Sequence, residues 1–446
     1  MVSGSDARRC SVSQQPENVA ETPPFDLYAF VRQLFPIARS LTGNGVRETL
    51  SAVAAFIPLK IVEVASGTPV LDWEVPEEWN IRAATIRSLS GEILVDFADN
   101  NLHVMGYSQS VRGVFSHELL AAHVHTLPQQ PGTIPYRTGY YARDWGFCLA
   151  HDVWSAMRDE AYYVEIDATL APGALTYGEA FLPGTSDGEI LISVHVCHPS
   201  LANDNLTGIA LATALANRAS RLPERRLGLR FLFLPATIGA ITWLAQNEHH
   251  LGRIRHGLVL TCLGDEGPFH YKRSRSGAPV DRAVEHVLRE AGHPFATLPF
   301  SPYGYDERQY SSPGFDLPVG CLMRSVHGTF PEYHTSLDNL DFVQPNALVA
   351  SFGVLCAILD LLDADRTYRR VDGRGEPQLG RRGLYRAIAG QKEAGGASQV
   401  DLLWFLNLAD GRHGLLDIAE RANVPFHRIA AAAALAREAH LVQEVL

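Results

Sequence analysis

The stretch "EILISVHVCHPSLANDNLTGIALATALANRASRL", residues 189–222, joins an apolar β-prone run to an alanine-rich run with helical spacing. The apolar run is typical of a strand that is covered on both faces of a sheet. The polar loop between the two runs carries His195, Cys197, His198 and Asp204. Because ligands of α/β proteins bind beyond the carboxyl ends of strands, this loop is a candidate site.

The loop by itself supports two interpretations. An imidazole and a carboxylate that leave one strand–loop–helix unit can reach the same divalent ion. A histidine at a strand end is also commonly a packed or capping residue. At this point a metal site and an ordinary polar loop are equally supported, and the rest of the chain has to distinguish them.

Strand-like and helix-like segments alternate on both sides of this stretch, from about residue 160 to 350. Further strands are expected at "AYYVEIDATL" (161–170), "LGLRFLFLP" (227–235) and "HGLVLTCLG" (256–264), with helices at 240–254 and 279–292. Such alternation predicts an α/β fold with a mostly parallel central sheet flanked by helices.

The composition changes along the chain and suggests four parts. Residues 25–69 and 150–365 are assigned to the α/β domain, and residues 70–149, with short β-prone runs between turns, to an inserted small β domain. Residues 1–24 are polar and are expected to form a disordered leader. A charged, glycine-rich linker is expected at 365–380, followed by a helical, winged-helix-like domain at 381–446.

The composition also limits the class of partner. The 446 residues carry a formal net charge of −11, which argues against a general binder of nucleic acid or anionic membranes. The six cysteines are scattered without a CxxC pair, which disfavours a zinc ribbon and fits a reducing compartment. With no apolar signal region and no segment of ~20 apolar residues recognised, we expect a cytoplasmic protein.

Three later loops carry further candidate ligands and acids. Asp265 follows the strand at 256–264, "YGYDERQY" (303–310) holds Asp306, Glu307 and Arg308, and "EYHTSLDN" (332–339) holds His334 beside Glu332. Each loop alone fits a turn, an ion pair or a helix cap equally well. Together, His, Asp, Asp and His after successive strands form a ligand set suited to zinc.

The order "H…ANDNLTG…D…YHTSLDN" resembles the zinc-dependent aminopeptidase superfamily, which includes leucyl aminopeptidases and glutaminyl cyclases. The longer motifs are similar to those of a bacterial group of aminopeptidase-like proteins and run from about residue 35 to 345, most of the chain. They are "SGTPVLDWEVPEEWNIR", "NLHVMGYS", "IPYRTGYY…WGFCL", "HVCHPSLANDNLTG", "PATIGAITWL", "YGYDERQYSSPGFDLPVG" and "EYHTSLDNLDFV". The resemblance implies an aminopeptidase-like α/β domain, a protease-associated-like β insert and a C-terminal winged helix.

Carried over position by position, the resemblance implies that one or two Zn²⁺ ions are held by His195, Asp204, Asp265 and His334. The superfamily places a Glu-Glu pair, a general base and a metal ligand, where this chain has Ala236 and Thr237. Alanine cannot accept a proton, and threonine is a poor zinc ligand. The usual base is therefore missing, and one metal position is weakened.

Other residues were assigned supporting roles. Glu307 is the first candidate for the missing base and Asp306 the second, while His198 is interpreted as a ligand, a proton shuttle or a structural hydrogen bonder. Cys197 stands where relatives often have a carboxylate that supports the metal histidine. Arg308, with Arg324 as a weaker candidate, and Glu332 complete the residues expected to contact the substrate or to support the site.

We therefore expect a zinc-dependent hydrolase that cleaves an amide or peptide-like bond of a small aminoacyl substrate, in specialised metabolism. The alternative is a metal- or ligand-binding homologue that has lost catalysis. A DNA-binding regulator is disfavoured, because residues 401–446 hold four arginines against six acidic residues, a balance of −2. A homo-oligomer is left open, and no membrane partner is expected.

Overall fold

The computed structural model describes residues 23–222, 224–384 and 397–445. These residues form two compact units, one ending at Asp363 and the other beginning at Ala364. Residues 1–22, which carry almost all of the predicted leader, lie outside the described residues.

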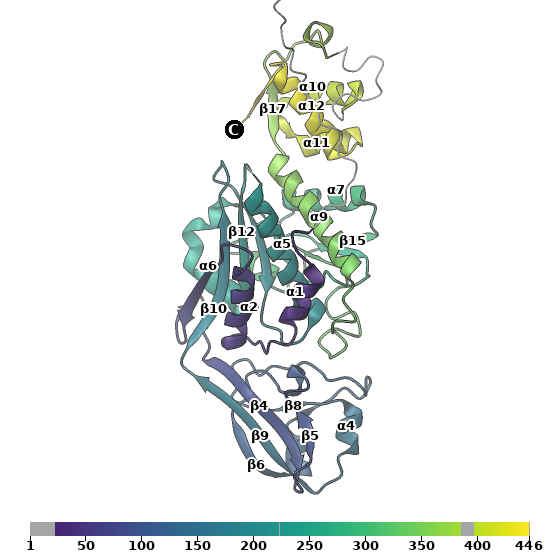
Figure 1. Cartoon of the computed structure of the whole chain (residues 1–446). Coiled ribbons are helices and arrows are strands. Elements are labelled where there is room, and N and C mark those ends of the chain that lie inside the picture. Colours follow the sequence, from purple (N-terminus) through teal and green to yellow (C-terminus); the bar gives the residue numbers. More distant parts are fainter. Residues whose placement is uncertain (1–22, 223, 385–396, 446) are drawn as a thin grey trace, which may run out of the picture. The chain divides into compact units, whose positions relative to one another are not determined.

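The first unit is built on an eight-stranded sheet in the order β1-β10-β12-β11-β13-β16-β14-β15 (Figure 1). The neighbouring strands β12, β11, β13 and β16 at its centre are parallel, whereas β1, β10 and β14 each have antiparallel neighbours. The predicted α/β fold is therefore confirmed. The strands are β1 Lys60–Ala65, β10 Ala174–Leu182, β11 Glu189–His195, β12 Gly228–Leu234, β13 Ile254–Leu260, β14 Phe269–Lys272, β15 Phe295–Leu298 and β16 Val319–Met323.

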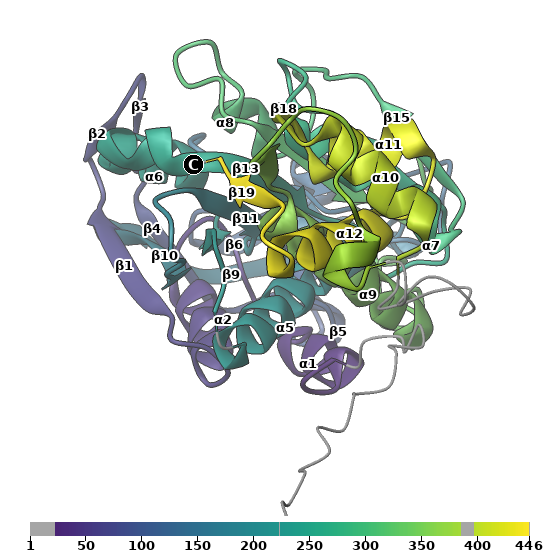
Figure 2. The ribbon, with the colours of Figure 1, turned by 90° about the horizontal axis from the view of Figure 1, so that it is seen from above.

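The central strands have helices on both faces. Seen from above, α1, α2 and α5 lie on one face, and α6 and α8 lie on the other (Figure 2). All seven side chains of β11 are buried, as the apolar sequence of that stretch predicts for a strand covered on both faces. The helices of this unit are α1 Leu27–Leu34, α2 Asn44–Ala54, α5 Thr207–Arg221, α6 Ile238–Asn247, α7 Pro279–Ala291, α8 Glu307–Tyr310 and α9 Pro345–Ala364, with 3₁₀ turns at η3 Glu248–Arg253 and η1 Asn101–His103.

A separate four-stranded antiparallel sheet forms the inserted β module, in the order β5-β4-β9-β6. Its strands are β4 Glu78–Ser88, β5 Ile93–Asp96, β6 Val111–Ser116 and β9 Ala161–Ala171. The prediction placed 161–170 in the central sheet and ended the insert at 149, and this was wrong. β9 pairs with β4 and β6. Its side chains alternate between buried and less buried positions, as expected for an antiparallel strand with one face on the core and one face toward solvent. The module also holds short pairs and helices: β2 Pro69–Val70 with β3 Trp73–Glu74, β7 Val124–His125 with β8 Phe147–Cys148, α3 His117–Ala121 and α4 His151–Ala156.

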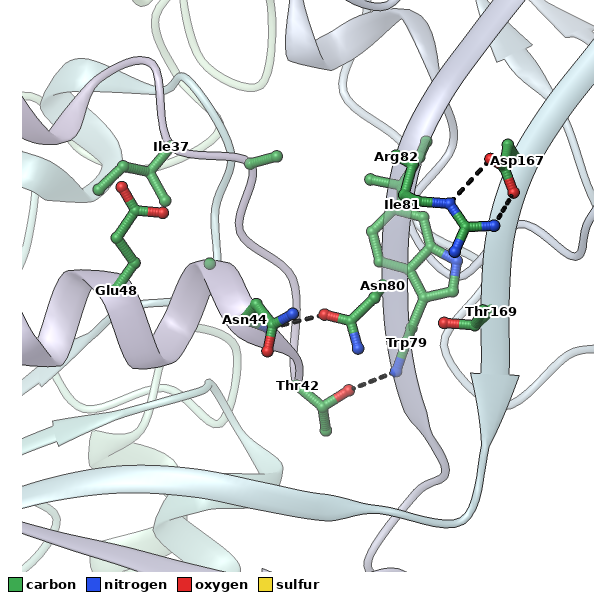
Figure 3. Close-up of a pocket in the computed structure, with 12 residues that line it drawn as sticks. Ile37, Thr42, Asn44, Glu48, Trp79, Asn80, Ile81, Arg82, Asp167 and Thr169 are labelled. Carbon is green, nitrogen blue, oxygen red and sulfur yellow. Dashed lines mark hydrogen bonds and ion pairs between the residues drawn. The ribbon is translucent and has the colours of Figure 1, made fainter.

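The junction of α2 with the module is polar and paired (Figure 3). A cavity of about 390 Å³ lies there, lined by residues of α2 and of strands β4 and β9. Arg82 donates to Asp167 across the two strands, and the Asn44 amide donates to Asn80 Oδ1 at 2.7 Å. Arg47 of α2 forms a bidentate ion pair with Glu78 at 2.7 and 2.8 Å. These bonds fix where the module leaves the central domain.

The second unit combines the helices α10 Gln399–Leu408, α11 Leu415–Ala422 and α12 Phe426–Glu438 with a three-stranded sheet. The sheet has the order β18-β17-β19, with β17 Thr367–Arg370, β18 Asp410–Gly414 and β19 Val442–Glu444. A 3₁₀ turn, η4, covers Gly380–Arg382. The prediction treated 365–380 as a linker, but β17 is the central strand of this sheet. Its alternating residues pair with both neighbours, so the domain begins about fifteen residues earlier than expected.

Within residues 23–222, 224–384 and 397–445, one helix passes a length and composition test for a membrane span. α9 has 20 residues and a mean hydropathy of 2.0, so the expectation that no segment is long and apolar enough was wrong. About 61% of the tested stretch is buried, including Phe352, Leu355 and Ile358. A core helix of a soluble domain passes the same test, so this finding is weak evidence for a membrane.

Candidate metal centre

The carboxylate of Asp204 lies at the centre of three imidazoles. His195 Nε2 is 2.9 Å from Asp204 Oδ1, and His334 Nε2 is 3.1 Å from Oδ2. His198 Nδ1 is 3.3 Å from the same Oδ2 and 3.0 Å from the Asp204 main-chain oxygen. The ligand atoms of His195, His198 and Asp204 all lie within 4.8 Å of one another. Such a donor set can hold a divalent metal ion.

The fold brings these side chains together at the carboxyl end of the central strands. His195 is the last residue of β11, and Asp204 lies in the segment Ala202–Leu206 before α5, where its own backbone is not helical (φ −112°, ψ 76°). Both oxygens of Asp338 accept main-chain bonds from this segment, from the Asn203 amide at 2.6 Å and from the Asp204 amide at 2.9 Å. The strand end and the Asp338 loop therefore hold the ligands from two sides.

The protonation states match those that metal binding requires. Burial alone would raise the pKa of Asp204, but His198 and His195 beside it hold that pKa well below its usual range. Burial lowers the pKa of His195 and of His334, against the opposing effect of Asp204. For His198, the attraction of Asp204 outweighs burial and raises the pKa. An ionised carboxylate thus faces two imidazoles that favour the neutral, ligating form.

Aromatic rings surround the imidazoles. Tyr305 stacks on His195 with the ring centroids 4.6 Å apart, and Tyr333 stacks on His334 at 3.9 Å. The ring of Tyr136, from the inserted module, meets both His198 and His334 edge-on at 5.0 Å. These contacts fix the ring orientations and exclude water from one side of the cluster.

The inserted module also holds the loop that carries His334. The Tyr136 amide donates to the His334 carbonyl at 2.8 Å, and Ile134 and Ser336 exchange two further bonds at 2.8 and 3.0 Å. His334 has a φ of +57°, in the left-handed region that non-glycine residues seldom occupy. Strain of this kind is characteristic of functional positions and persists because the surrounding bonds enforce it.

Asp265, one of the four predicted ligands, does not join the cluster. Its carboxylate accepts bonds from Asn203 Nδ2 at 2.8 Å, the Gly267 amide at 2.7 Å and the Ser325 hydroxyl at 2.7 Å. Asp265 therefore organises the loop beside the metal ligands, since its partner Asn203 immediately precedes Asp204. The structure places it in a supporting position and puts His198 in the cluster instead.

Glu307, the first candidate for the missing base, lies in a buried ion pair. Lys272 Nζ donates to Glu307 Oε1 at 2.7 Å, and the Tyr305 amide donates to Oε2 at 3.0 Å. The two charged side chains are 3% and 0% exposed, so neither is free to meet a substrate in this arrangement. Glu307 holds the loop that presses Tyr305 against His195.

Asp306, the second candidate, is in a different situation. It is 1% exposed, and its Oδ1 has no hydrogen-bond partner within the part of the chain that the structure describes. Burial and the neighbouring Glu307 raise the pKa of Asp306 to about 7, against the opposing effect of Arg308. Arg308 Nε is likewise buried without a partner among the described residues. Asp306 and Arg308 therefore each carry one buried polar atom without a partner among the described residues.

Three further candidates have structural surroundings. Cys197 Sγ faces the Ala236 carbonyl at 3.8 Å, and burial raises the pKa of this thiol to about 12. Arg324 donates to Ser351 Oγ of α9 and to the Gly267 carbonyl. These bonds link α9 to the loop of Gly267, which is a structural role. Glu332 accepts turn bonds from Thr335 through its main-chain oxygen.

Sequence reasoning missed Lys272 and the roles of Asp338 and Tyr136. Asp338 is not among the candidate residues named from the sequence. A signal for Asp338 exists, because it is the one carboxylate of the TSLDN motif and lies four residues beyond His334. Lys272 and Tyr136 carry no local signal, since their partners lie 35 and more than 60 residues away.

Comparison with known proteins supports the division of the chain into an aminopeptidase-like part and a C-terminal winged helix. A family model described as "Domain of unknown function (DUF4910)" matches residues 28–365, and a "winged helix-turn-helix" model matches residues 366–444. A Clostridium acetobutylicum protein named "Putative polysaccharide biosynthesis protein with aminopeptidase-like domain" is 45% identical over 418 residues, covering 94% of this chain and 95% of its own.

Solved structures show the same relationship. A crystal structure of a "putative peptidase" from Clostridium acetobutylicum superposes with a TM-score of 0.88 at 44% identity, covering 94% of this chain and 96% of that one. A zinc aminopeptidase from Bacillus subtilis shares the fold with a TM-score of 0.55 at 12% identity, covering 76% and 95%. The resemblance to zinc aminopeptidases and the C-terminal winged helix are thereby confirmed, and the chain belongs to the DUF4910 family, with an aminopeptidase-like fold.

Proposed function

We propose that the protein is a zinc-dependent hydrolase of the aminopeptidase type, which cleaves an amide or peptide-like bond of a small aminoacyl substrate. The observation that carries this proposal is the buried Asp204 carboxylate with the imidazoles of His195, His198 and His334 around it. Three imidazoles and one carboxylate suit zinc. A zinc ion held there supplies Lewis acidity to the scissile carbonyl and to an attacking water.

The chain's own residues supply the proton transfer and the positioning. Asp306 is favoured as the proton acceptor over Glu307, because its Oδ1 has no hydrogen-bond partner among the described residues and burial raises its pKa to about 7, whereas both oxygens of Glu307 accept hydrogen bonds. A base is most effective when its pKa lies near the working pH. The pKa of the Cys197 thiol is raised chiefly by burial and to a smaller extent by the charge of Asp306. Asp306 therefore acts electrostatically on the loop that follows His195. Arg308, with its unpartnered Nε, is a counter-charge for a substrate carboxylate.

The test combines metal analysis with hydrolysis of aminoacyl amides by the full chain. We expect the wild type to retain zinc and His195→Ala to lose both zinc and turnover. Asp306→Asn should retain zinc but lose turnover by about 10²-fold or more, as expected for loss of a general base. Asp316→Asn is the matched control, since Asp316 is an exposed carboxylate of the same loop that pairs with Arg275. Turnover that is unchanged in His195→Ala would contradict the proposal.

A second candidate function rests on Ala236, which stands where the superfamily has its base. In that case the chain is a catalytically altered protein that binds a metal or ligand. Hydrolysis that appears only in Ala236→Glu would favour this candidate, and robust turnover by the wild type would exclude it.

The setting of the reaction is also part of the proposal. The name of the Clostridium acetobutylicum relative favours a role in a biosynthetic pathway rather than in general protein degradation. We place the protein in the cytoplasm, acting without membrane or nucleic acid, on the support of its net charge of −11 and its scattered cysteines. The winged helix is assigned to packing or oligomerisation, and salt-dependent DNA binding by the full chain would contradict that assignment.

A further inference from the structure

A second cavity of the first unit is lined by aromatic and acidic side chains outside the histidine cluster. Its volume is about 430 Å³. It lies where the turn before β2 and the segment 74–77, at the end of β3, meet the segment 140–143 of the inserted module. Its lining residues are Ser66, Gly67, Glu74, Val75, Pro76, Glu77, Tyr107, Tyr140, Tyr141, Ala142, Arg143, Leu170 and Pro172.

The aromatic rings at this cavity are open to solvent. Tyr140 and Tyr141 are each 45% exposed, and Trp73, whose ring centroid lies 5.8 Å from that of Tyr141, is 52% exposed. Exposed large aromatic rings gathered at one cavity are uncommon on a protein that binds nothing there. Tyr140 has a φ of +49°, so the backbone is also held in the left-handed region at this point.

The charges at the cavity do not cancel. Glu77 is paired with Arg143, which neutralises both. The Glu74 carboxylate has no ion-pair or hydrogen-bond partner among residues 23–222, 224–384 and 397–445, and only its main-chain oxygen is used, by the Tyr141 hydroxyl at 3.0 Å. One unpaired negative charge therefore lies beside Tyr141, and it raises the pKa of that phenol after the larger effect of burial. A free carboxylate next to exposed aromatic faces is the chemistry that attracts an organic cation.

The cavity is within reach of the histidine cluster through one short segment. Tyr136 touches His198 and His334, and Tyr140 of the cavity follows four residues later. Four residues span at most ~14 Å even when fully extended. Burial has the largest effect on the pKa of Tyr140 and raises it. Cys197 and Asp306 raise this pKa further, and Arg308 lowers it. A single substrate of moderate length can therefore occupy both places.

We propose that this cavity binds an organic cation, an ammonium or quaternary ammonium group, through Glu74 and the faces of Tyr140 and Tyr141. The link to catalysis rests on the proposed function: the substrate then carries a cationic group in addition to the scissile bond. The cation site itself does not depend on turnover, because its residues lie outside the metal centre.

The test measures binding of choline to the full chain by calorimetry, with and without chelation of metal. The neutral carbon isostere 3,3-dimethylbutan-1-ol is the comparison ligand. We expect saturable choline binding that is independent of metal, and binding of the isostere that is weaker by about 5- to 30-fold, the range of one cation–π and charge contact. Glu74→Gln and Tyr141→Leu should each weaken choline binding several-fold, whereas Tyr141→Phe keeps the ring and should retain most of it.

Matched controls and outcomes separate this inference from the proposed function. Glu92→Gln, an exposed carboxylate of the same module away from the cavity, should leave choline binding unchanged. Absence of saturable choline binding, or equal affinity for the neutral isostere, overturns the cation site even if aminoacyl amides are hydrolysed. If neutral oligosaccharides bind and choline does not, the cation site is overturned in favour of a carbohydrate site. Choline binding without any hydrolysis would support the cation site and count against the hydrolase alone.

Discussion

Removing Lys272 should destabilise the protein far more than removing an equivalent surface charge. Lys272 and Glu307 are 2.7 Å apart, and their side chains are 3% and 0% exposed. Lys272→Met leaves the Glu307 carboxylate buried with only the Tyr305 amide as a partner. Breaking a buried pair from one side costs about 3–5 kcal/mol, because the remaining charge is desolvated without compensation.

The assay is urea unfolding of the full chain, followed by circular dichroism. Arg273→Met is the matched control, because Arg273 is the next residue, is half exposed and pairs with Glu285. Loss of that surface pair should change the free energy of unfolding by only ~0–1 kcal/mol. The double variant Lys272→Met with Glu307→Leu removes both charges and should recover most of the loss, with a coupling energy above ~1.5 kcal/mol.

The same experiment tests the role of Glu307. If Glu307 anchors its loop, Lys272→Met should lower zinc retention and turnover together, since Tyr305 then loses its fixed place on His195. If Glu307 is instead the general base, Glu307→Gln should abolish turnover. A loss of stability below ~1 kcal/mol for Lys272→Met, or no coupling in the double variant, would refute the ion-pair reasoning.

Three other predictions follow from single contacts. Asp204→Asn should lose bound zinc by elemental analysis while the far-ultraviolet circular dichroism stays unchanged, because the amide keeps the shape of the side chain but loses its charge; retained zinc would contradict the ligand assignment. The pKa of Glu78 is lowered to about 2, chiefly by its bond to Arg47, so its stabilisation is present above pH ~4.5 and is lost as the pH falls toward 2. In Glu78→Gln the free energy of unfolding should lack this pH-dependent contribution, which is about 1–2 kcal/mol after screening by solvent. If the variant and the wild type lose stability equally between pH 4.5 and 2, the pair contributes nothing. Gly320→Ala should lower the free energy of unfolding by about 1–3 kcal/mol, since a Cβ there would lie 2.2 Å from the buried hydroxyl of Tyr271; a neutral effect in urea unfolding would mean that the ring can move aside.

The sequence by itself determined the central architecture and three of the four residues that gather in the histidine–aspartate cluster. The apolar run of β11 and the helical spacing of α5 give both elements without reference to other parts of the chain, because burial on both faces and amphipathic periodicity are local patterns. The loop between them puts His195 and Asp204 at a strand end, and His334 stands out as a histidine in a later polar loop, with the family resemblance in support. These residues now lie around one carboxylate.

Only the tertiary structure decided which sheet each strand joins and which acids face the metal centre. β9 has the composition of a strand in either sheet, and its pairing with β4 and β6 depends on residues far away in the chain. Asp265 and Glu307 were reasonable candidates by type and position, but Asn203 and Lys272 hold them. The physical reason is that charge–charge and hydrogen-bond partners are chosen across long loops, where sequence spacing carries no information about distance.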